Sequence, residues 1–98
     1  MTFEVHITPV AEEQLLLLKK DKGLAKRFKA VCKAIHLLST NPRHPGLQTH
    51  KYESIQGENG EDIFEAYAEQ NTPAAYRIFW HYGPSKRQLS IIAITPHP

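Results

Sequence analysis

The sequence predicts an α+β domain: an N-terminal strand, a helix hairpin, and then an antiparallel sheet meander. Three observations predict it. The first residues alternate apolar and polar side chains, residues 9–40 carry the apolar spacing of helices, and four short runs with strand-like composition follow, separated by turn residues. Because 98 residues is the length of one ordinary domain, we expect residues 1–98 to form a single domain.

The N-terminal strand and the first helix follow directly from local patterns. Phe3–Ile7 alternates in the way that predicts a strand with one buried face. Thr8 can cap a helix with its hydroxyl, and Pro9 suits the first helical turn. The helix runs through Leu15–Leu18 and is expected to stop near Asp21-Lys22-Gly23, where glycine permits a tight turn.

The second helix has the clearest periodicity in the chain. One apolar stripe steps by four, three, four and three residues through Leu24, Phe28, Val31, Ile35 and Leu38. Cys32 adjoins this stripe, so we expect it to be a small, buried core residue. Asn41-Pro42 ends the helix, because the residue before proline disfavours the α conformation.

Four strands are predicted after the loop of residues 41–50. They are Tyr52–Ile55, Ile63–Glu69, Ala74–Tyr82 and Leu89–Ile94. The short connections between them contain glycine, proline and asparagine, which favours antiparallel hairpins. We therefore expect the helix hairpin to cover one face of this sheet and to leave the other face open.

Composition limits the classes of function. The hydrophobic fraction of 41% and the charged fraction of 22% are typical of a soluble globular domain. A single cysteine excludes an internal disulfide and indicates a reducing compartment. The chain shows neither a membrane-length apolar run nor a signal-peptide start, so we expect a cytoplasmic protein with no membrane contact. Phosphate-loop, dinucleotide and zinc-protease motifs are missing, and we expect no cofactor and no metal.

Charge is unevenly divided along the chain. Residues 1–50 hold eight basic and four acidic side chains, a net charge of +4, whereas residues 51–98 hold four basic and six acidic ones, a net charge of −2. The excess of lysine in the helix hairpin suits a phosphate-bearing or acidic partner. The alternative is an ordinary solvated helix surface.

Strand alternation sorts the polar residues of the predicted sheet into two faces. If Tyr76, Ile78 and Trp80 pack on the helices together with Phe64 and Ala66, the opposite face collects a different set of side chains. That set is Glu65, Tyr67, Arg77, Phe79 and His81. Arginine and histidine suit phosphate chemistry, and Tyr67 or Phe79 could stack on a base of single-stranded nucleic acid. The alternative interpretation of Arg77 and Glu65 is a cross-strand ion pair.

The remaining histidines are open to more than one interpretation. His44 and His50 flank a proline-rich loop, where either could lock the loop by hydrogen bonds. His50 and Lys51 precede the sheet, and His97 follows its last strand. His97 can therefore reach the open face only if the C-terminal segment docks on the sheet.

The layout resembles the RelE/ParE superfamily of toxins from bacterial type II toxin–antitoxin systems. The local matches are Asn41-Pro42-Arg43 with Gly46-Leu47, then His50-Lys51-Tyr52, Phe64-Glu65-Ala66-Tyr67, Tyr76-Arg77-Ile78-Phe79-Trp80, and the end of the chain from Ile94. The resemblance covers most of the chain and implies a RelE/ParE-like fold. Its members range from ribosome-dependent messenger RNA endonucleases to inhibitors of DNA gyrase.

The resemblance implies a site on the open sheet face. Arg77 matches the family arginine that stabilises charge on the phosphate, and it is the one residue whose role is transferred. We hypothesise that His81 or His97 acts as general acid or base and that Tyr67 stacks or donates a proton. His50, Lys51, Glu65 and Phe79 are the candidate substrate-binding residues. The chain departs from the family where Glu65 and Tyr67 stand in place of lysines.

Three functions remain open from the sequence. The first is a ribosome-dependent messenger RNA endoribonuclease toxin, with the ribosome, messenger RNA and a cognate antitoxin as partners. The second is a non-catalytic toxin that acts by binding a protein such as gyrase, with the basic helix hairpin as its docking surface. The third is a non-toxic, stand-alone member of the fold.

Overall fold

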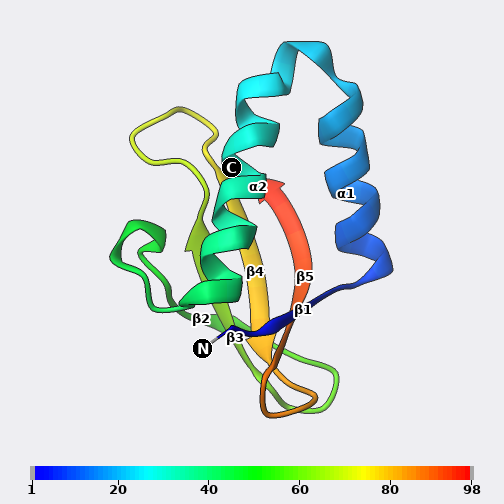
Figure 1. The fold of residues 1–98 in the computed structure, drawn as a ribbon, viewed down its shortest axis with the longest axis vertical. Coiled ribbons are helices and arrows are strands. Elements are labelled where there is room, and N and C mark those ends of the chain that lie inside the picture. The colour runs from blue at the N-terminus through cyan, green and yellow to red at the C-terminus, as the bar shows by residue number, and fades with distance from the viewer. Residues whose placement is uncertain (1, 98) are drawn as a thin grey trace.

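The structure of the chain is a computed structural model, and it describes residues 2–97. In chain order the elements are β1 (Glu4–Ile7), α1 (Pro9–Lys20), α2 (Ala25–Thr40), β2 (His50–Gln56), β3 (Asp62–Tyr67), β4 (Tyr76–Tyr82) and β5 (Gln88–Pro96). One-turn 3-10 helices at Lys22–Leu24 and Pro45–Leu47 lie in the connections. The predicted order of strand, helix hairpin and four further strands is confirmed (Figure 1).

The five strands form one mixed sheet in the order β1-β5-β4-β3-β2. Strands β2 to β5 pair antiparallel, as the short turns predicted, whereas β1 pairs parallel to β5 at the opposite edge from β2. Parallel pairing needs a long connection, and the helix hairpin together with β2, β3 and β4 separates the two parallel strands in sequence. Among the described residues, no helix is long and apolar enough to cross a membrane.

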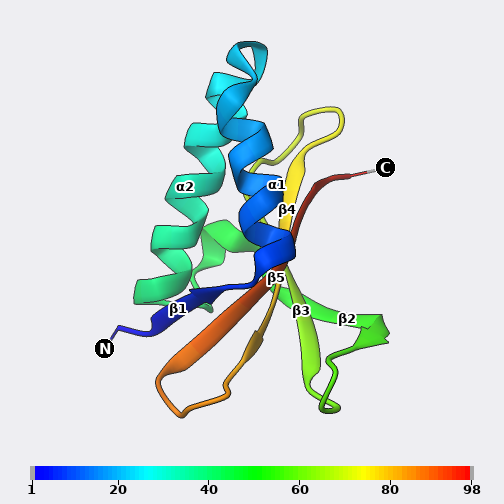
Figure 2. The same cartoon turned by 90° about the vertical axis from the view of Figure 1, so that its right-hand side faces the viewer.

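Both helices lie on the same side of the sheet (Figure 2), and the core fills the space between the two layers. On α2 the predicted stripe is confirmed: Val31 and Leu38 are fully buried, and Phe28 packs against the same core. The sheet contributes Ala66, Ile78, Trp80, Leu89, Ile91 and Ile94. Burial of these apolar side chains fixes which sheet face meets the helices and which face is turned away from them.

Two predictions about local structure were wrong. Cys32 is exposed, because it follows Val31 by about 100° around α2 and that rotation carries it past the edge of the apolar stripe. The strands also begin and end elsewhere: β2 starts at His50, and the turn between β3 and β4 takes in Glu69 and Ala74. Cross-strand pairing of His50 with Glu65 extends β2.

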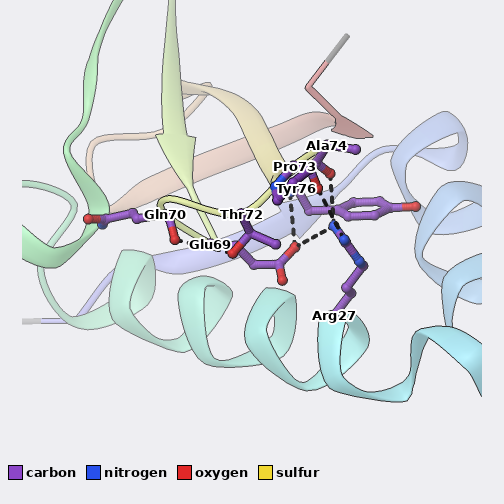
Figure 3. A network of polar contacts seen from close by, with 7 residues as sticks. All are labelled: Arg27, Glu69, Gln70, Thr72, Pro73, Ala74 and Tyr76. Atoms are coloured by element: carbon purple, nitrogen blue, oxygen red, sulfur yellow. Dashed lines mark hydrogen bonds and ion pairs between the residues drawn. The ribbon is translucent and has the colours of Figure 1, made fainter.

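Arg27 of α2 links the turn between β3 and β4 to the helix layer by hydrogen bonds (Figure 3). Its guanidinium donates hydrogen bonds to the carbonyl oxygens of Pro73 and Ala74, at 3.1 and 2.9 Å, and to the Glu69 carboxylate at 3.2 Å. The same carboxylate accepts the Tyr76 backbone N–H at 3.1 Å. Ala74 has a φ of 54°, a region that costs a non-glycine residue free energy, so these bonds hold a strained turn in place.

We expect Arg27→Ala to lower the free energy of unfolding by about 1–2 kcal/mol, because three hydrogen bonds from a charged donor are lost at a partly exposed site. Urea denaturation measures this loss. Lys26→Ala, on the exposed neighbour in the same helix turn, is the matched control and should change stability by less than about 0.5 kcal/mol. Equal stability of the two variants would contradict the role given to Arg27.

Candidate functional site

The sheet face turned away from the helices carries most of the candidate residues. Tyr67 lies directly across from Arg77, and Glu65 directly across from Phe79, so all four side chains share this face. Their neighbours on the other parity, Ala66, Ile78 and Trp80, are in the core. The predicted division of β3 and β4 into a core face and an open face is therefore confirmed. We call His50, Glu65, Tyr67 and Arg77 the Glu65 cluster.

Glu65 is the acceptor at the centre of this cluster. It is 2% exposed, and its two oxygens receive three side-chain donors. Oε2 pairs with Nη1 of Arg77, whereas Oε1 lies 2.8 Å from Nε2 of His50 and accepts the Tyr67 hydroxyl at 3.4 Å. A buried carboxylate is stable only when charged or polar groups compensate it, so these three donors are held around Glu65. The cross-strand ion pair expected as the alternative is present.

His50 faces an oxygen acceptor with each of its ring nitrogens. Nε2 meets the Glu65 carboxylate, and Nδ1 lies 3.1 Å from the backbone oxygen of Gln48. With these two contacts His50 ties the start of β2 to the preceding loop, which is the loop-locking role that the sequence allowed. His44 also stabilises its own loop, because its Nδ1 accepts the Gly46 N–H at 2.9 Å.

Aromatic rings pack against the residues of the Glu65 cluster. The Arg77 guanidinium lies over the Phe79 ring, 5.0 Å from its centroid, and Tyr52 meets Phe79 edge-on at 5.0 Å. The rings of His50 and Tyr67 lie 5.7 Å apart. Arg77 is thereby held between the Glu65 carboxylate and the Phe79 ring, with its side chain 13% exposed, and its buried Nε has no hydrogen-bond partner within the part of the chain that the structure describes. The guanidinium is fixed in position, and its exposed part is what a phosphate can meet.

Tyr67 and His97 line one hollow at the edge of the cluster. The hollow has a volume of about 540 Å³ and is closed by Gln48, Gln70 and the turn of residues 71–75. The C-terminal segment docks on the sheet, because the His97 N–H donates to the Ala75 oxygen at 2.8 Å, continuing the ladder in which Arg77 pairs with Thr95. Alternation along this ladder places His97 on the same face as Arg77. The structure thus brings Tyr67, Arg77 and His97 to one region.

Burial raises the pKa of the Tyr67 phenol above its ordinary value of 10.0, and the negative charge of Glu65 acts in the same direction. The phenol therefore keeps its proton at neutral pH and can donate it. Because the folded chain holds this proton more tightly, the stabilisation is complete below pH 10 and is lost as pH rises through the folded-state pKa. We expect the unfolding free energy of Tyr67→Phe to fall less steeply with alkaline pH than that of the wild type. Urea denaturation on both sides of that pH measures the two slopes, and equal slopes would contradict the shift.

His81 does not join the cluster, and its role as general acid or base stays a prediction. It lies four residues further along β4, a displacement of roughly 13 Å at the rise of a strand. Its Nδ1 lies 2.8 Å from the Tyr82 backbone oxygen. Its charge acts instead on Glu61, where hydrogen bonds from the Glu61 and Asn59 backbone N–H groups lower the pKa of the carboxyl and His81 adds to that effect. The prediction that His81 and Arg77 share a sheet face did not take into account how far apart they lie along β4.

Lys51 lies outside the Glu65 cluster, and Phe79 lies beneath it. Lys51 pairs with Phe64, whose side chain packs on the core, and it therefore lies on the other sheet face from Glu65. It makes an ion pair of 3.5 Å with Asp62. Phe79 is 7% exposed beneath Arg77 and Tyr52, so it offers no free ring for a base to stack on. Phe79 is a support for Arg77.

Gln48 is a site residue that the sequence did not indicate. It has a φ of 46°, in the left-handed region, and this turn aims its carbonyl oxygen at His50 while the residue also lines the hollow. Left-handed glutamine is uncommon, and no glycine or asparagine marked the position. Within residues 2–97, no group of three or more histidine, cysteine, aspartate or glutamate side chains is arranged to hold a metal ion.

Comparison with known proteins places the fold. No family model and no curated protein match the chain. Among solved structures, the RelE of the archaeal RelE–RelB complex from Pyrococcus horikoshii OT3 has a TM-score of 0.64 and 17% identity, with 98% of this chain and 96% of that chain covered. The YoeB dimer from Staphylococcus aureus has a TM-score of 0.66 and 12% identity, with both chains fully covered.

A YoeB/ParE toxin from Agrobacterium tumefaciens is similar over the same extent, with a TM-score of 0.65 and 11% identity, covering 98% of this chain and all of that one. The chain therefore has the fold of the RelE/ParE toxin superfamily, as the sequence resemblance implied. At these identities the likeness concerns the fold, and the function has to be argued from the site.

Proposed function

We propose that the chain is the toxin of a toxin–antitoxin pair and that it cleaves messenger RNA on the ribosome. The observation that carries this proposal is that Tyr67 and His97 line one hollow and that Arg77 lies directly across from Tyr67, on the sheet face turned away from the helices. A cation, a protonated phenol and an imidazole are the groups that phosphodiester cleavage needs. The similarity of the fold to RelE and YoeB toxins supports the same conclusion.

The reaction assigned to the site is attack of a ribose 2′-hydroxyl on the adjacent phosphate. The 2′-oxygen forms a bond to phosphorus as the bond from phosphorus to the 5′-oxygen breaks. His97 takes the proton of the 2′-hydroxyl, and the Tyr67 phenol donates a proton to the leaving 5′-oxygen. Arg77 donates hydrogen bonds to the phosphate oxygens, on which negative charge builds up. The products are a 2′,3′-cyclic phosphate and a 5′-hydroxyl end.

In this scheme Glu65 is a positioning residue. It contacts Arg77, His50 and Tyr67 and fixes all three at once, although it is too deeply buried to reach an RNA chain. Its negative charge also limits the positive potential of the cluster. Binding of RNA therefore needs cations beyond the cluster, or the context of the ribosome, to supply affinity.

The test is incubation of the purified protein with messenger RNA, in the presence and in the absence of translating ribosomes, followed by analysis of the fragment ends. We expect cleavage when ribosomes are present, with 5′-hydroxyl and cyclic phosphate ends. Fragments with 5′-phosphate ends would contradict the 2′-hydroxyl mechanism. Intact RNA in both reactions would overturn the proposed activity.

The partner that completes this proposal is an antitoxin that docks on the outer surface of α1. Val10, Leu16 and Leu17 are exposed there, with Leu17 62% exposed, and Lys19 and Lys20 follow at the end of the helix. Exposed apolar residues next to basic ones fit an acidic, amphipathic segment. The same surface is the docking face that a gyrase-type, protein-binding toxin would use, and that function predicts growth arrest with intact messenger RNA.

A further inference from the structure

A second hollow, distinct from the one that Tyr67 and His97 line, lies on the other side of strand β2. It has a volume of about 460 Å³. Four of its lining residues carry basic side chains, namely Arg43, His44, His50 and Lys51, and no acidic residue of the described chain lines it. We call it the basic hollow. Arg43 and Lys51 are the cations of this lining, and together they favour an anionic ligand.

Aromatic side chains form the wall of the basic hollow that faces the sheet. Phe64 and Trp80 stack with centroids 5.1 Å apart, and Tyr82 meets both rings edge-on. Trp80 is completely buried, yet its Nε1 has no hydrogen-bond partner among the described residues. Tyr82 is exposed and lies at the end of β4. The exposed Tyr82 ring with basic residues nearby is suited to a nucleobase with its phosphate.

The basic hollow is continuous with the Glu65 cluster through one residue. His50 lines the hollow and also contacts Glu65 at 2.8 Å on the opposite sheet face. This continuity is available because β2 is an edge strand, so a ligand can pass around its first residues. The next residue, Lys51, is half exposed, and its pairing with Asp62 at 3.5 Å is the kind of surface ion pair that a phosphate can displace.

We propose that the basic hollow binds a nucleotide of the same single-stranded RNA that is cleaved at Arg77. The RNA passes around the start of β2, where Lys51 and Arg43 contact a phosphate, and its base lies against the Tyr82 side of the aromatic wall. This inference rests on the proposed function, since both require RNA as the ligand. The basic hollow supplies the positive charge that the neutral Glu65–Arg77 pair lacks.

Trp80 makes the proposal measurable, because it is the single tryptophan of the chain and lines the basic hollow. The probe is a 2′-O-methyl RNA of about six nucleotides, which lacks the 2′-hydroxyl nucleophile and stays intact. We expect it to change the fluorescence of Trp80 in a saturable way. Lys51→Ala and Arg43→Ala should each weaken binding about five- to tenfold and flatten the salt dependence by about 0.7 per lost phosphate contact.

Lys29→Ala is the matched control, because it removes one exposed lysine from α2, away from the basic hollow, and should bind as the wild type does. An acidic peptide of the same length is the competing probe. Unchanged Trp80 fluorescence with RNA, wild-type affinity in both Lys51→Ala and Arg43→Ala, or a response to the peptide alone would each overturn the proposal.

The outcome separates this inference from the proposed function. RNA binding with the expected losses but without cleavage of natural RNA supports the basic hollow and overturns the nuclease. Cleavage of natural RNA with no response of Trp80 overturns the basic hollow and leaves the nuclease in place.

Discussion

Arg77→Ala is expected to lower RNA cleavage about 10²- to 10³-fold, the usual loss when one donor to a developing charge is removed. Arg77 is held between the Glu65 carboxylate and the Phe79 ring, and alanine keeps neither contact. His50 does not replace it, because each of its ring nitrogens already faces an acceptor. The measurement is the initial rate of fragment formation with translating ribosomes.

Two controls make the result specific to position. Arg87→Ala removes one exposed arginine from the turn between β4 and β5 and should cleave at the wild-type rate. Circular dichroism and thermal melting should show that Arg77→Ala is folded at the assay temperature. Wild-type cleavage by a folded Arg77→Ala protein would remove Arg77 from the mechanism.

Glu65→Ala is expected to lower the free energy of unfolding by about 3–5 kcal/mol, because it leaves a mostly buried guanidinium without its counter-charge. The side chains of Glu65 and Arg77 are 3% and 13% exposed, so water compensates little of the loss. For a domain of this length, that is a large share of the total stability. Urea denaturation at neutral pH measures it.

The double variant Glu65→Leu/Arg77→Met tests whether the lost charge balance is the cause. Removing both charges leaves no unpaired ion, so we expect it to recover most of the stability that Glu65→Ala loses, while remaining inactive. A double variant as unstable as Glu65→Ala would show that packing, and not charge, governs the site.

The sequence was sufficient for the fold and for the faces of the sheet because both follow from periodicity. The stripe from Leu24 to Leu38 specifies which side of α2 is buried. In β3 and β4, strict alternation placed Glu65 and Arg77 on one sheet face and Ala66 and Ile78 on the other. Cys32 shows the limit of this reasoning, because one residue's rotation around a helix separates the core from solvent.

The details of the site depended on register and on turns, which local patterns do not specify. The face on which Lys51 lies was not predicted, because its pairing with Phe64 is decided by where β2 joins β3. His81 shares a face with Arg77 but lies too far along the strand to act with it. The contact between His50 and Glu65 follows a left-handed turn at Gln48. Glutamine rarely adopts this conformation, so the sequence did not predict the turn.

Inducible expression in growing bacteria, with growth and messenger RNA integrity followed in the same culture, tests the central claim most directly. The claim is that the open-face cluster around Arg77 cleaves messenger RNA during translation. We predict growth arrest with fragmented messenger RNA for the wild type, and normal growth with intact messenger RNA for Arg77→Ala. Arrest by the wild type with intact messenger RNA would contradict the claim and assign the chain to the toxins that act by binding a protein.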